Sequence, residues 1–397
     1  MTKKVEKRVP DIRFKGFTDD WEQRKLGEVL SKFDYGLNTA STNYDGQNKY
    51  LRITDIDDNS HLFLKDNLTS PSNLPINKKN YQLKKGDMVF ARTGASVGKT
   101  YKYLSEDGKV YFAGFLIRGR VKGKNDIGFV FNTTLQDSYK NFVKVMSIRS
   151  GQPGINSKEY QKHKIYVPKF NEQRELSNFI SKLDKAIALQ QKKLEQLKQF
   201  KKAMLQQSFP DKDGKLQIRF TGFTDAWEQR KLGDVVERFD NLRIPVTSSK
   251  RKRGITPYYG ANGIQDYVQG YTHDGEFVLV AEDGANDLQN YPIHYVNGKV
   301  WVNNHAHVLQ GKKDIADNLF LVNAIKRIKF ETYLVGGSRA KLNADVMMKL
   351  PIKMPKLNEQ QKLGKYFSRI DTLIALHQRK LDHLKLLKKF LLQKMFI

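Results

Sequence analysis

The stretch Ile12–Phe33 reads IRFKGFTDDWEQRKLGEVLSKF, and it returns at Ile218–Phe239 as IRFTGFTDAWEQRKLGDVVERF. Sixteen of these 22 positions are identical. An internal repeat of this quality says more about architecture than any local motif, because it means that one structural unit is used twice. The chain therefore contains two copies of one scaffold.

A second pair of segments repeats further along the chain. Ile165–Phe209 and Ile352–Phe396 are identical at 22 of 45 positions, whereas the stretches between the repeats share no such identity. We infer one frame that carries two different inserts, a single-chain imitation of a two-fold dimer. This organisation predicts a first domain over residues 1–160, a long helix within 161–214, a second domain over 215–350 and a second long helix within 351–397.

Length and charge restrict the class of protein. The 397 residues suit two globular units with connectors, and 70 Lys and Arg against 42 Asp and Glu give a net charge of +28. So large a basic excess favours a polyanionic partner, by default nucleic acid. No apolar run approaches the ~18 residues of a membrane span. The N-terminus lacks an apolar signal segment and cysteine is absent, so we expect a cytoplasmic protein.

The second repeat predicts two long helices. Asn171 can cap the first and Glu172 suits its first turn, whereas Pro210 and Gly214 follow its end. Apolar residues recur at spacings of three and four, which is typical of a coiled-coil seam. The seam residues are Leu176, Ile180, Leu183, Ile187, Leu194 and Leu197 in the first copy, and Leu363, Phe367, Ile370, Ile374, Leu381 and Leu384 in the second.

A stripe this narrow requires a partner helix, and each copy can supply it to the other. We therefore expect an intramolecular, antiparallel coiled coil; an intermolecular coiled coil that dimerises the protein is the alternative. Polar residues occupy matching seam positions and can fix the register: Gln190 matches His377, and Lys201 matches Lys388. The lysines of the first helix also fit a solvated face, although they could follow phosphates: Lys192, Lys193, Lys198, Lys201 and Lys202.

The inserts are typical of mixed α/β domains with much strand. Runs rich in β-branched and aromatic residues, bounded by Gly, Asn and Asp, predict strands. These runs are Tyr50–Ile56, Gly86–Ala91, Lys109–Val121, Glu276–Gly284 and Lys299–Leu309. Short helices are expected within Phe129–Met146 and Asp317–Tyr333. The fold class is thus α/β (α+β): two mixed domains separated by two long helices, with pseudo-two-fold symmetry.

This pattern resembles the specificity subunit of type I restriction–modification enzymes. Each long helix opens with P-x-x-x-E-Q, as Pro168–Gln173 and Pro355–Gln360. FTDDWEQRKLGEV (Phe17–Val29) and its second copy are similar to the segment that opens each domain in that family. YLRITDI, GDMVFARTGASVGK and NNHAHVL are similar to strands and loops of its target-recognition domains.

The resemblance implies a function and a set of partners. Each target-recognition domain would read one half of a bipartite, asymmetric double-stranded DNA site, and the helices would set the gap between the halves. The helices would also dock two modification subunits, which carry S-adenosylmethionine and methylate adenine, and ATP-driven restriction subunits would join them. S-adenosylmethionine, ATP and magnesium are then expected on partner subunits and no cofactor on this chain.

One loop resembles a phosphate-binding loop without its spacing. Gly94-Ala-Ser-Val-Gly98-Lys99-Thr100 follows an apolar run, but the nucleotide-binding motif needs four residues between its glycines and this loop has three. The sequence after Thr100 also favours strand and turn over the required helix. A loop that offers backbone N–H groups, Arg92 and Lys99 to DNA phosphate is the preferred interpretation, and a purely structural turn is the alternative.

Motifs for catalysis are missing from the sequence. There is no Pro-Pro dipeptide for a flipped adenine, no Gly-x-Gly and no Glu-x-Lys. His305 and His307 lie one residue apart in an expected strand, hence on one face, but no third metal ligand is evident. We therefore expect a non-catalytic chain without a metal. Two further hypotheses remain: a coiled-coil protein with non-specific nucleic-acid-binding domains, disfavoured by the divergent inserts, and an enzyme with its own nucleotide site.

Candidate DNA contacts come from cations and amides near strand ends and before the long helices. Such groups bind phosphates or base edges, although a solvated surface charge is the alternative for each. In the first insert they are Arg52, Thr54, Arg92, Thr93, Ser96, Lys99, Arg118, Arg149 and Gln152. In the second they are Asn262, Asn304, His305, Arg339 and Lys341, with Asn303, Glu282 and Asp283 nearby.

Overall fold

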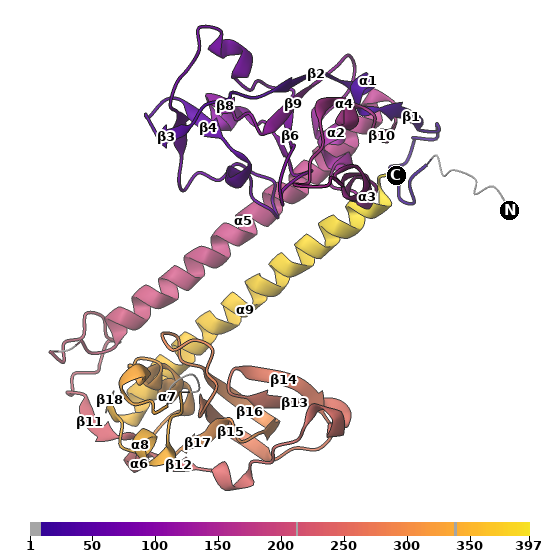
Figure 1. Cartoon of the computed structure of the whole chain (residues 1–397). Helices are drawn as coiled ribbons and strands as arrows, with labels where there is room; N and C mark the ends of the chain where they lie inside the picture. The colour runs from indigo at the N-terminus through magenta and orange to yellow at the C-terminus, as the bar shows by residue number, and fades with distance from the viewer. Residues whose placement is uncertain (1–8, 212, 337–339) are drawn as a thin grey trace. The chain divides into compact units, whose positions relative to one another are not determined.

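The computed structural model describes residues 9–211, 213–336 and 340–397 (Figure 1). Contacts divide the chain into two units: Met1–Gln190 with Lys380–Ile397, and Gln191–Arg379. Each unit therefore holds one insert together with a part of each long helix. No described helix is both long and apolar enough to traverse a lipid bilayer.

The first unit is built around a four-stranded antiparallel sheet in the order β2-β9-β6-β7. Its strands are β2 (Leu30–Tyr35), β9 (Leu116–Val121), β6 (Asp87–Ala91) and β7 (Thr100–Lys102). Smaller pairs join β3 (Ser41–Asn43) to β5 (Thr69–Pro71), and β4 (Lys49–Leu51) to β8 (Val110–Phe112). The helices are α1 (Leu26–Val29), α2 (Ile127–Thr133), α3 (Asp137–Met146) and α4 (Ser157–Gln161).

The second unit has a six-stranded mixed sheet in the order β12-β17-β15-β16-β13-β14. Its strands are β12 (Val236–Arg238), β17 (Ala306–Gly311), β15 (His273–Ala281), β16 (Ile293–Val302), β13 (Arg253–Gly260) and β14 (Gly263–Val268). Its helices are α6 (Leu232–Val235), α7 (Asn318–Ile325) and α8 (Ala344–Met348). The mixed α/β class predicted for both inserts is confirmed.

Both units share a three-strand arrangement inside their sheets. Strand β2 pairs with β9, which pairs with β6, just as β12 pairs with β17, which pairs with β15. The registers match as well: Leu30 lies opposite Val121, and Val236, at the same place in the repeat, lies opposite Gly311. The frame therefore extends into each insert, although the sequences there have diverged.

The repeated motifs act as a clamp at the base of each unit. Strand β1 (Glu22–Lys25) pairs with β10 (Lys164–Val167), as β11 (Glu228–Lys231) pairs with β18 (Pro351–Met354). Arg13 donates to both carboxylate oxygens of buried Glu172, at 2.6 and 2.8 Å, and Arg219 does the same to Glu359. The P-x-x-x-E-Q motif is thus structural, because its Glu joins the helix to the opening segment.

The Gln of the same motif joins the helix to the insert. Gln173 donates to the Pro168 carbonyl and accepts from the backbone N–H of Asp126, which caps α2. Gln360 makes the equivalent bonds to the Pro355 carbonyl and to the N–H of Asp317, which caps α7. Both Gln side chains are buried, so these bonds link the frame to each variable domain.

The two long helices are α5 (Phe170–Ser208) and α9 (Leu357–Lys394), and they pack against each other within the chain. Lys388 pairs with Asp184 in the first unit, and Lys201 pairs with Asp371 in the second. Late residues of one helix thus meet early residues of the other, which confirms the antiparallel intramolecular pair. All twelve seam residues are buried or half-buried.

Each helix end closes the core of one unit. In the second unit, Phe209 directly follows α5 and stacks on Phe320 at 5.6 Å, with Trp227 against both rings. In the first unit, Phe396 near the end of the chain stacks on Phe129 at 5.4 Å, with Trp21 against both. The core of the first unit is therefore completed by the last residues of the sequence.

Several local predictions were wrong in detail. Asn171 lies inside α5 and does not cap it, because the helix begins at Phe170. Of the strand predicted over Tyr50–Ile56, only the start is extended; a 3-10 turn follows, where Asp55 accepts from the Arg52 N–H. The strand predicted over Lys299–Leu309 is two strands with a turn at residues 303–305. Lys201, expected on a solvated face, is ion-paired with Asp371.

Candidate nucleic-acid interface

The first unit contains a hollow of about 650 Å³ at the end of strand β2. Three of the predicted DNA contacts line it: Arg52, Thr54 and Arg92. Side chains that the sequence argument did not single out complete its wall, namely Tyr35, Asn38 and Phe115. We refer to this feature as the Arg92 hollow. Residues from four separate stretches of sequence meet there.

Arg92 follows strand β6, and its backbone is held on both sides. Its N–H donates to the Phe115 carbonyl at 3.0 Å, and its carbonyl accepts from the Ile155 N–H at 2.9 Å. The guanidinium lies over the Tyr35 ring, 4.9 Å from its centroid. Within the described part of the chain, this guanidinium has no hydrogen-bond or ion-pair partner. Arg92 thus offers five N–H donors to the hollow.

Arg52 lines the same hollow, but its guanidinium is already hydrogen-bonded to other side chains of the unit. Its Nε and Nη2 donate to the carboxylate of Asp55 at 2.9 and 2.8 Å, and its Nη1 donates to the Ser41 hydroxyl at 3.2 Å. The hydrogen bond to Asp55 raises the pKa of Arg52, so the side chain stays charged. Its charge is nevertheless balanced by the adjacent carboxylate, and Arg52 serves better as a wall of the hollow than as a ligand for phosphate.

Four backbone N–H groups of the loop after Arg92 are hydrogen-bonded within the unit. The N–H groups of Gly94, Val97, Gly98 and Lys99 all donate to backbone carbonyls of the unit. Gly94 and Gly98 have φ values of +76° and +86°, so glycine serves the turn there. The side chain of Lys99 donates to the Ile56 carbonyl and pairs with Asp58, and only 11% of it is exposed.

Hydrogen bonds within the unit hold this loop as a turn. Thr93 forms a β-bridge with Gly154, and the carbonyl of Ser96 accepts from the Lys99 N–H. Lys99 and these N–H groups are thus engaged within the domain, and their contact with DNA phosphate stays a prediction.

Two further predicted contacts are occupied inside the first unit. Arg118 is buried and donates to the Asn80 carbonyl and to Asp34, so its guanidinium is engaged within the unit. Arg149 bonds both carboxylate oxygens of Glu159 and the carbonyls at the end of α3, which makes it a cap for that helix. Gln152 is exposed and lies beside Gly94.

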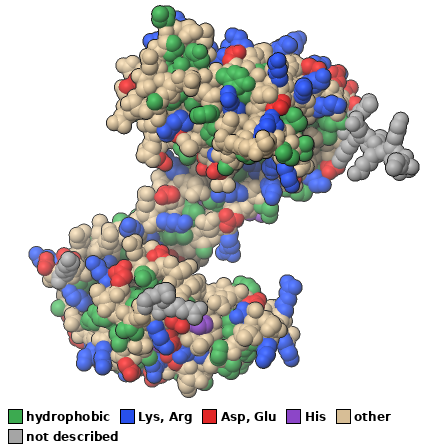
Figure 2. Space-filling view, viewed as in Figure 1, with side chains coloured by type: hydrophobic (Ala, Val, Ile, Leu, Met, Phe, Trp, Pro, Cys, Tyr) green, Lys and Arg blue, Asp and Glu red, His purple; other side chains and the backbone are tan. Residues whose placement is uncertain are grey.

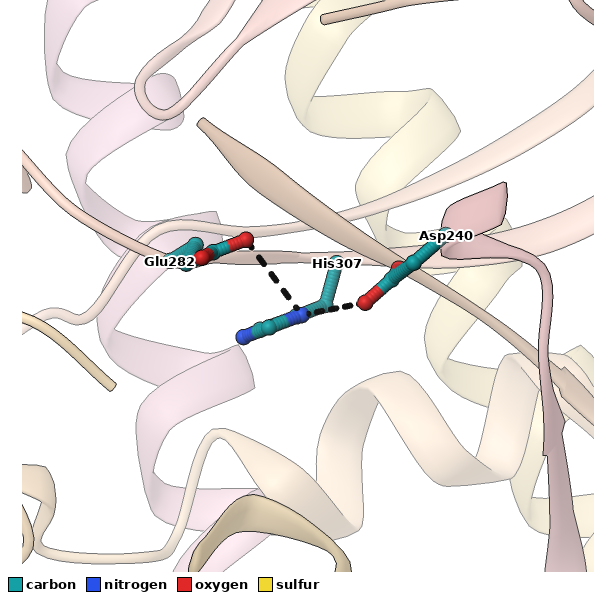
Figure 3. A group of neighbouring side chains, drawn as sticks. All are labelled: Asp240, Glu282 and His307. Carbon is teal, nitrogen blue, oxygen red and sulfur yellow. Dashed lines mark hydrogen bonds and ion pairs between the residues drawn. The ribbon is translucent and has the colours of Figure 1, made fainter. Parts of the chain in front are cut away.

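The second unit has a buried ionic network at the matching place in its sheet (Figure 3). His307 on β17 is 1% exposed; its Nδ1 lies 2.7 Å from Asp240 and 3.6 Å from Glu282. Its Nε2 faces the Leu342 carbonyl at 2.9 Å. Glu282 also accepts from Arg243 at 2.6 Å and from Lys341 at 2.9 Å. The network ties four stretches of the unit together.

Asp240, Glu282 and His307 have the separations of a metal-ligand set, yet their contacts favour an ion-pair network. Both nitrogens of His307 already face oxygen atoms, and Arg243 and Lys341 already supply positive charge to Glu282. Burial by itself raises the pKa of each carboxyl, but hydrogen bonds from His307 to Asp240, and from Arg243 and Lys341 to Glu282, lower both pKa values overall. The carboxylates are therefore stabilised without a metal.

The other candidates of the second unit lie around this network. His305 is in the turn before β17, pairs with Asp283 at 2.5 Å and is 44% exposed, so it does not share the environment of His307. Asn304 is exposed in the same turn, and its carbonyl accepts from Arg243 at 3.5 Å. Asn262 bridges the Gly284 carbonyl and the Asn286 N–H. Arg339 lies outside the described residues.

Sequence reasoning missed Tyr35, Phe115 and Arg243. Tyr35 lies two residues after Phe33, the last residue of the first repeated segment, where the sequences of the two copies begin to diverge. This divergence in sequence could have identified Tyr35. Phe115 is an aromatic residue between two strands with 60% of its surface exposed, and its sequence alone reads as core strand. On the face drawn in Figure 2, lysine and arginine side chains are spread over both units.

Comparison with known proteins places this architecture in a family. Residues 18–199 and 224–386 match the family model described as type I restriction modification DNA specificity domain. The Haemophilus influenzae protein named as type I restriction enzyme specificity subunit S.HindORF215P is 46% identical over 149 residues, which covers 38% of each chain. The MjaVIII specificity subunit of Methanocaldococcus jannaschii is 20% identical over 408 residues, covering 94% of this chain and 91% of that one.

Among solved structures, the type I restriction-modification system S subunit from M. genitalium has the same fold. The TM-score is 0.73 at 14% identity, and the match covers 98% of this chain and 99% of that one. The family model covers both inserts and most of each repeated segment, in agreement with the two-copy frame found in the structure. This chain belongs to the type I restriction modification DNA specificity family.

Proposed function

We propose that this protein is the non-catalytic subunit that recognises double-stranded DNA in a type I restriction–modification complex, and that it works in the cytoplasm. The first domain would read one half of a bipartite, asymmetric site and the second domain the other half. The observation that carries this proposal is the combination of one repeated frame with two unlike inserts. Non-specific binding gives two such domains no reason to differ.

The charge and the contacts of the chain support DNA as the ligand. The net charge of +28 favours a polyanion, and phosphate contacts would supply most of the affinity. The two modification subunits would bring S-adenosylmethionine, and the restriction subunits would bring ATP and magnesium. Names of relatives as restriction enzyme specificity subunits agree with such partners.

The test is to map methylated adenines in cells that express the chain with the modification subunits of the same host. We expect one split motif with unlike halves and a fixed gap, and no methylation of that motif when this chain is omitted. Replacing residues 35–160 by the matching segment of a related chain should change one half of the motif and leave the other.

Two results would contradict the proposal. A change of both halves after the exchange would mean that the inserts act as one combined surface. Methylation without a motif would favour the coiled-coil alternative with non-specific binding. Exposed lysines of α5, such as Lys192 and Lys193, are the feature consistent with that alternative.

A further inference from the structure

We propose that Arg92 is the residue with which the first domain reads a guanine, donating from its guanidinium to guanine O6 and N7 inside the Arg92 hollow. The proposal rests on the proposed function and deepens it, because it assigns one base of one half-site to one side chain. It also changes the role expected for Arg92 from the sequence, which was a contact to DNA phosphate.

The guanidinium of Arg92 has donors available for a ligand. Within the described residues, Arg92 has no hydrogen-bond or ion-pair partner, whereas Arg52, Arg118 and Arg149 each bond a carboxylate of the same unit. A planar fork of N–H groups matches the two acceptors that guanine displays in the major groove. Of the arginines predicted to contact DNA, Arg92 alone within the described chain has that fork free.

The backbone and the side chain of Arg92 are both held in place before DNA binds. Two backbone hydrogen bonds, to Phe115 and from Ile155, fix the Arg92 main chain. The Tyr35 ring supports the guanidinium at 4.9 Å, and the Tyr35 hydroxyl in turn accepts from the Ser157 N–H at 3.3 Å. A long side chain that is already ordered loses less conformational entropy on binding, so the free donors can contribute to discrimination between bases.

The shape and the aromatic wall of the Arg92 hollow suit a base edge. Phosphate contacts on a duplex are made by lysine as well as arginine and need no concave site. Arg92 instead lies in a concave site of about 650 Å³ whose wall includes the half-exposed ring of Tyr35 and the exposed ring of Phe115. Such a site suits a flat base edge with apolar surroundings better than it suits the phosphate backbone.

The residue at the position of Arg92 differs between the two domains. Strand β6 ends at Ala91, paired with Leu116, and β15 ends at Ala281, paired with Ala306. The next residue is Arg92 in the first domain and Glu282 in the second, where Arg243 and Lys341 bind it. The shared frame thus presents a free cation in one domain and a neutralised anion in the other. The guanine requirement should therefore belong to one half-site only.

The experiment selects bound duplexes from a random DNA library, using the full chain assembled with its modification subunits. Wild type is compared with Arg92→Ala, Arg92→Lys, Tyr35→Ala and the control Tyr35→Phe. We expect Arg92→Ala to lose the guanine preference at a single position of one half-site, and Arg92→Lys, whose ammonium can still donate to guanine, to weaken it. Affinity for the wild-type motif should fall roughly 5- to 150-fold, as for one bidentate base contact. Tyr35→Phe keeps the ring and should keep the preference, whereas Tyr35→Ala should weaken it.

Duplexes with 7-deazaguanine at that position remove the N7 acceptor and provide an independent check. Wild type should bind them more weakly than the guanine duplex, and Arg92→Ala should not distinguish the two. Uniform weakening of all duplexes by Arg92→Ala, with recovery in Arg92→Lys and a salt slope reduced by about one, would overturn the proposal and make Arg92 a phosphate contact.

An unchanged motif in every Arg92 variant would also overturn the assignment, but the proposed function would stand. If wild type itself selects no motif, the proposed function has failed. Comparing the circular dichroism spectra of the variants shows whether each is folded, and Arg92→Lys, the mildest change, decides if Arg92→Ala is not.

Discussion

His163 is a buried histidine whose burial opposes its protonation. It is 5% exposed, its ring lies 4.5 Å from that of Phe142, and its Nε2 has no hydrogen-bond partner in the described structure. Burial lowers its pKa to about 4 from the usual value of 6.5. Leu350 occupies the same place in the second copy of the repeat, so this position accepts an apolar side chain.

The first prediction is that His163 makes the first unit sensitive to mild acid. The histidine of the unfolded chain takes up a proton as the pH falls through 6.5, whereas the folded chain resists until about pH 4. The free energy of unfolding should therefore be unaffected above pH 6.5 and should fall by about 3 kcal/mol between there and pH 4. His163→Leu should remove this part of the pH dependence.

The measurement is hydrogen exchange of first-unit peptides at pH values from 7 to 4, because two units need not unfold as one. The exposed His383→Leu serves as the matched control and should keep the wild-type dependence. If His163→Leu retained the full loss of protection on acidification, other groups of the unit would have to be responsible.

The second prediction concerns Glu172, the acid of the P-x-x-x-E-Q motif. Its side chain is 2% exposed and Arg13, which bonds it twice, is 14% exposed. Glu172→Gln should lower the stability of the first unit by about 3–5 kcal/mol, because it leaves a largely buried guanidinium without its charge partner. Exposed Glu175→Gln should change it by no more than about 0.5 kcal/mol.

Hydrogen exchange of peptides from β1 and β10 would measure this difference. Glu359→Gln should produce the same effect in β11 and β18 of the second unit and leave the first unit alone. Equal stability of the Glu172→Gln and Glu175→Gln proteins would show that the pair is not a clamp.

Among the elements, the long helices combine two tasks in one sequence. Their seams carry paired charges at matching positions, with side-chain exposures of 15% and 51% for Lys201 and Asp371, and 17% and 46% for Lys388 and Asp184. Pairs so exposed contribute roughly 0–1 kcal/mol each. They serve to fix register and direction, whereas the apolar seam residues and the aromatic ends supply the stability.

The third prediction follows from the helix ends. Phe396 is 3% exposed and packs against Trp21 and Phe129 of the first unit. Phe396→Ala should destabilise that unit by about 3–5 kcal/mol, as expected for a large cavity in a core. Its counterpart Phe209→Ala should destabilise the second unit by a similar amount.

Unit-specific hydrogen exchange or limited proteolysis would separate the two effects. Ile397, the next residue, is half-buried, and Ile397→Ala is therefore a milder control. Loss of protection in the second unit alone after Phe396→Ala would contradict the packing of Phe396 in the core of the first unit.

At the scale of the whole molecule, the helices should act as a spacer between the two half-sites. The fourth prediction uses a seven-residue insertion in both helices, after Gln191 in α5 and after Gln378 in α9, which are matching positions of the repeat. One heptad preserves the phase of the seam and adds about 10.5 Å of helix. At ~3.4 Å per base pair, the gap should grow by about three base pairs while both half-sites stay the same.

Methylation mapping of cells that express the lengthened chain would report the gap directly. An insertion of four residues provides the contrast, because it shifts the seam out of phase and should reduce the amount of folded complex. A seven-residue insertion that altered a half-site, or left the gap unchanged, would exclude the spacer role.

The sequence by itself determined the parts of this protein that are encoded locally or by repetition. Identity between Ile12–Phe33 and Ile218–Phe239 specified a frame used twice, because equal sequences fold to equal local structures. Spacings of three and four specified the two helices and their seam, and the strands at Gly86–Ala91 and Glu276–Gly284 followed from runs of β-branched and aromatic residues. The net charge indicated a polyanionic ligand.

Only the tertiary structure decided which charged side chains remain available for that ligand. Lys99 binds the Ile56 carbonyl, 43 residues away in sequence, and Arg118 binds Asp34, 84 residues away. Arg92, a candidate DNA contact of the same kind, lies over Tyr35, and none of the described residues accepts a hydrogen bond from its guanidinium. Local spacing fixes backbone conformation, but the partner of a long, flexible cation is chosen by distant segments that the fold brings together, and no periodicity in the sequence records that choice.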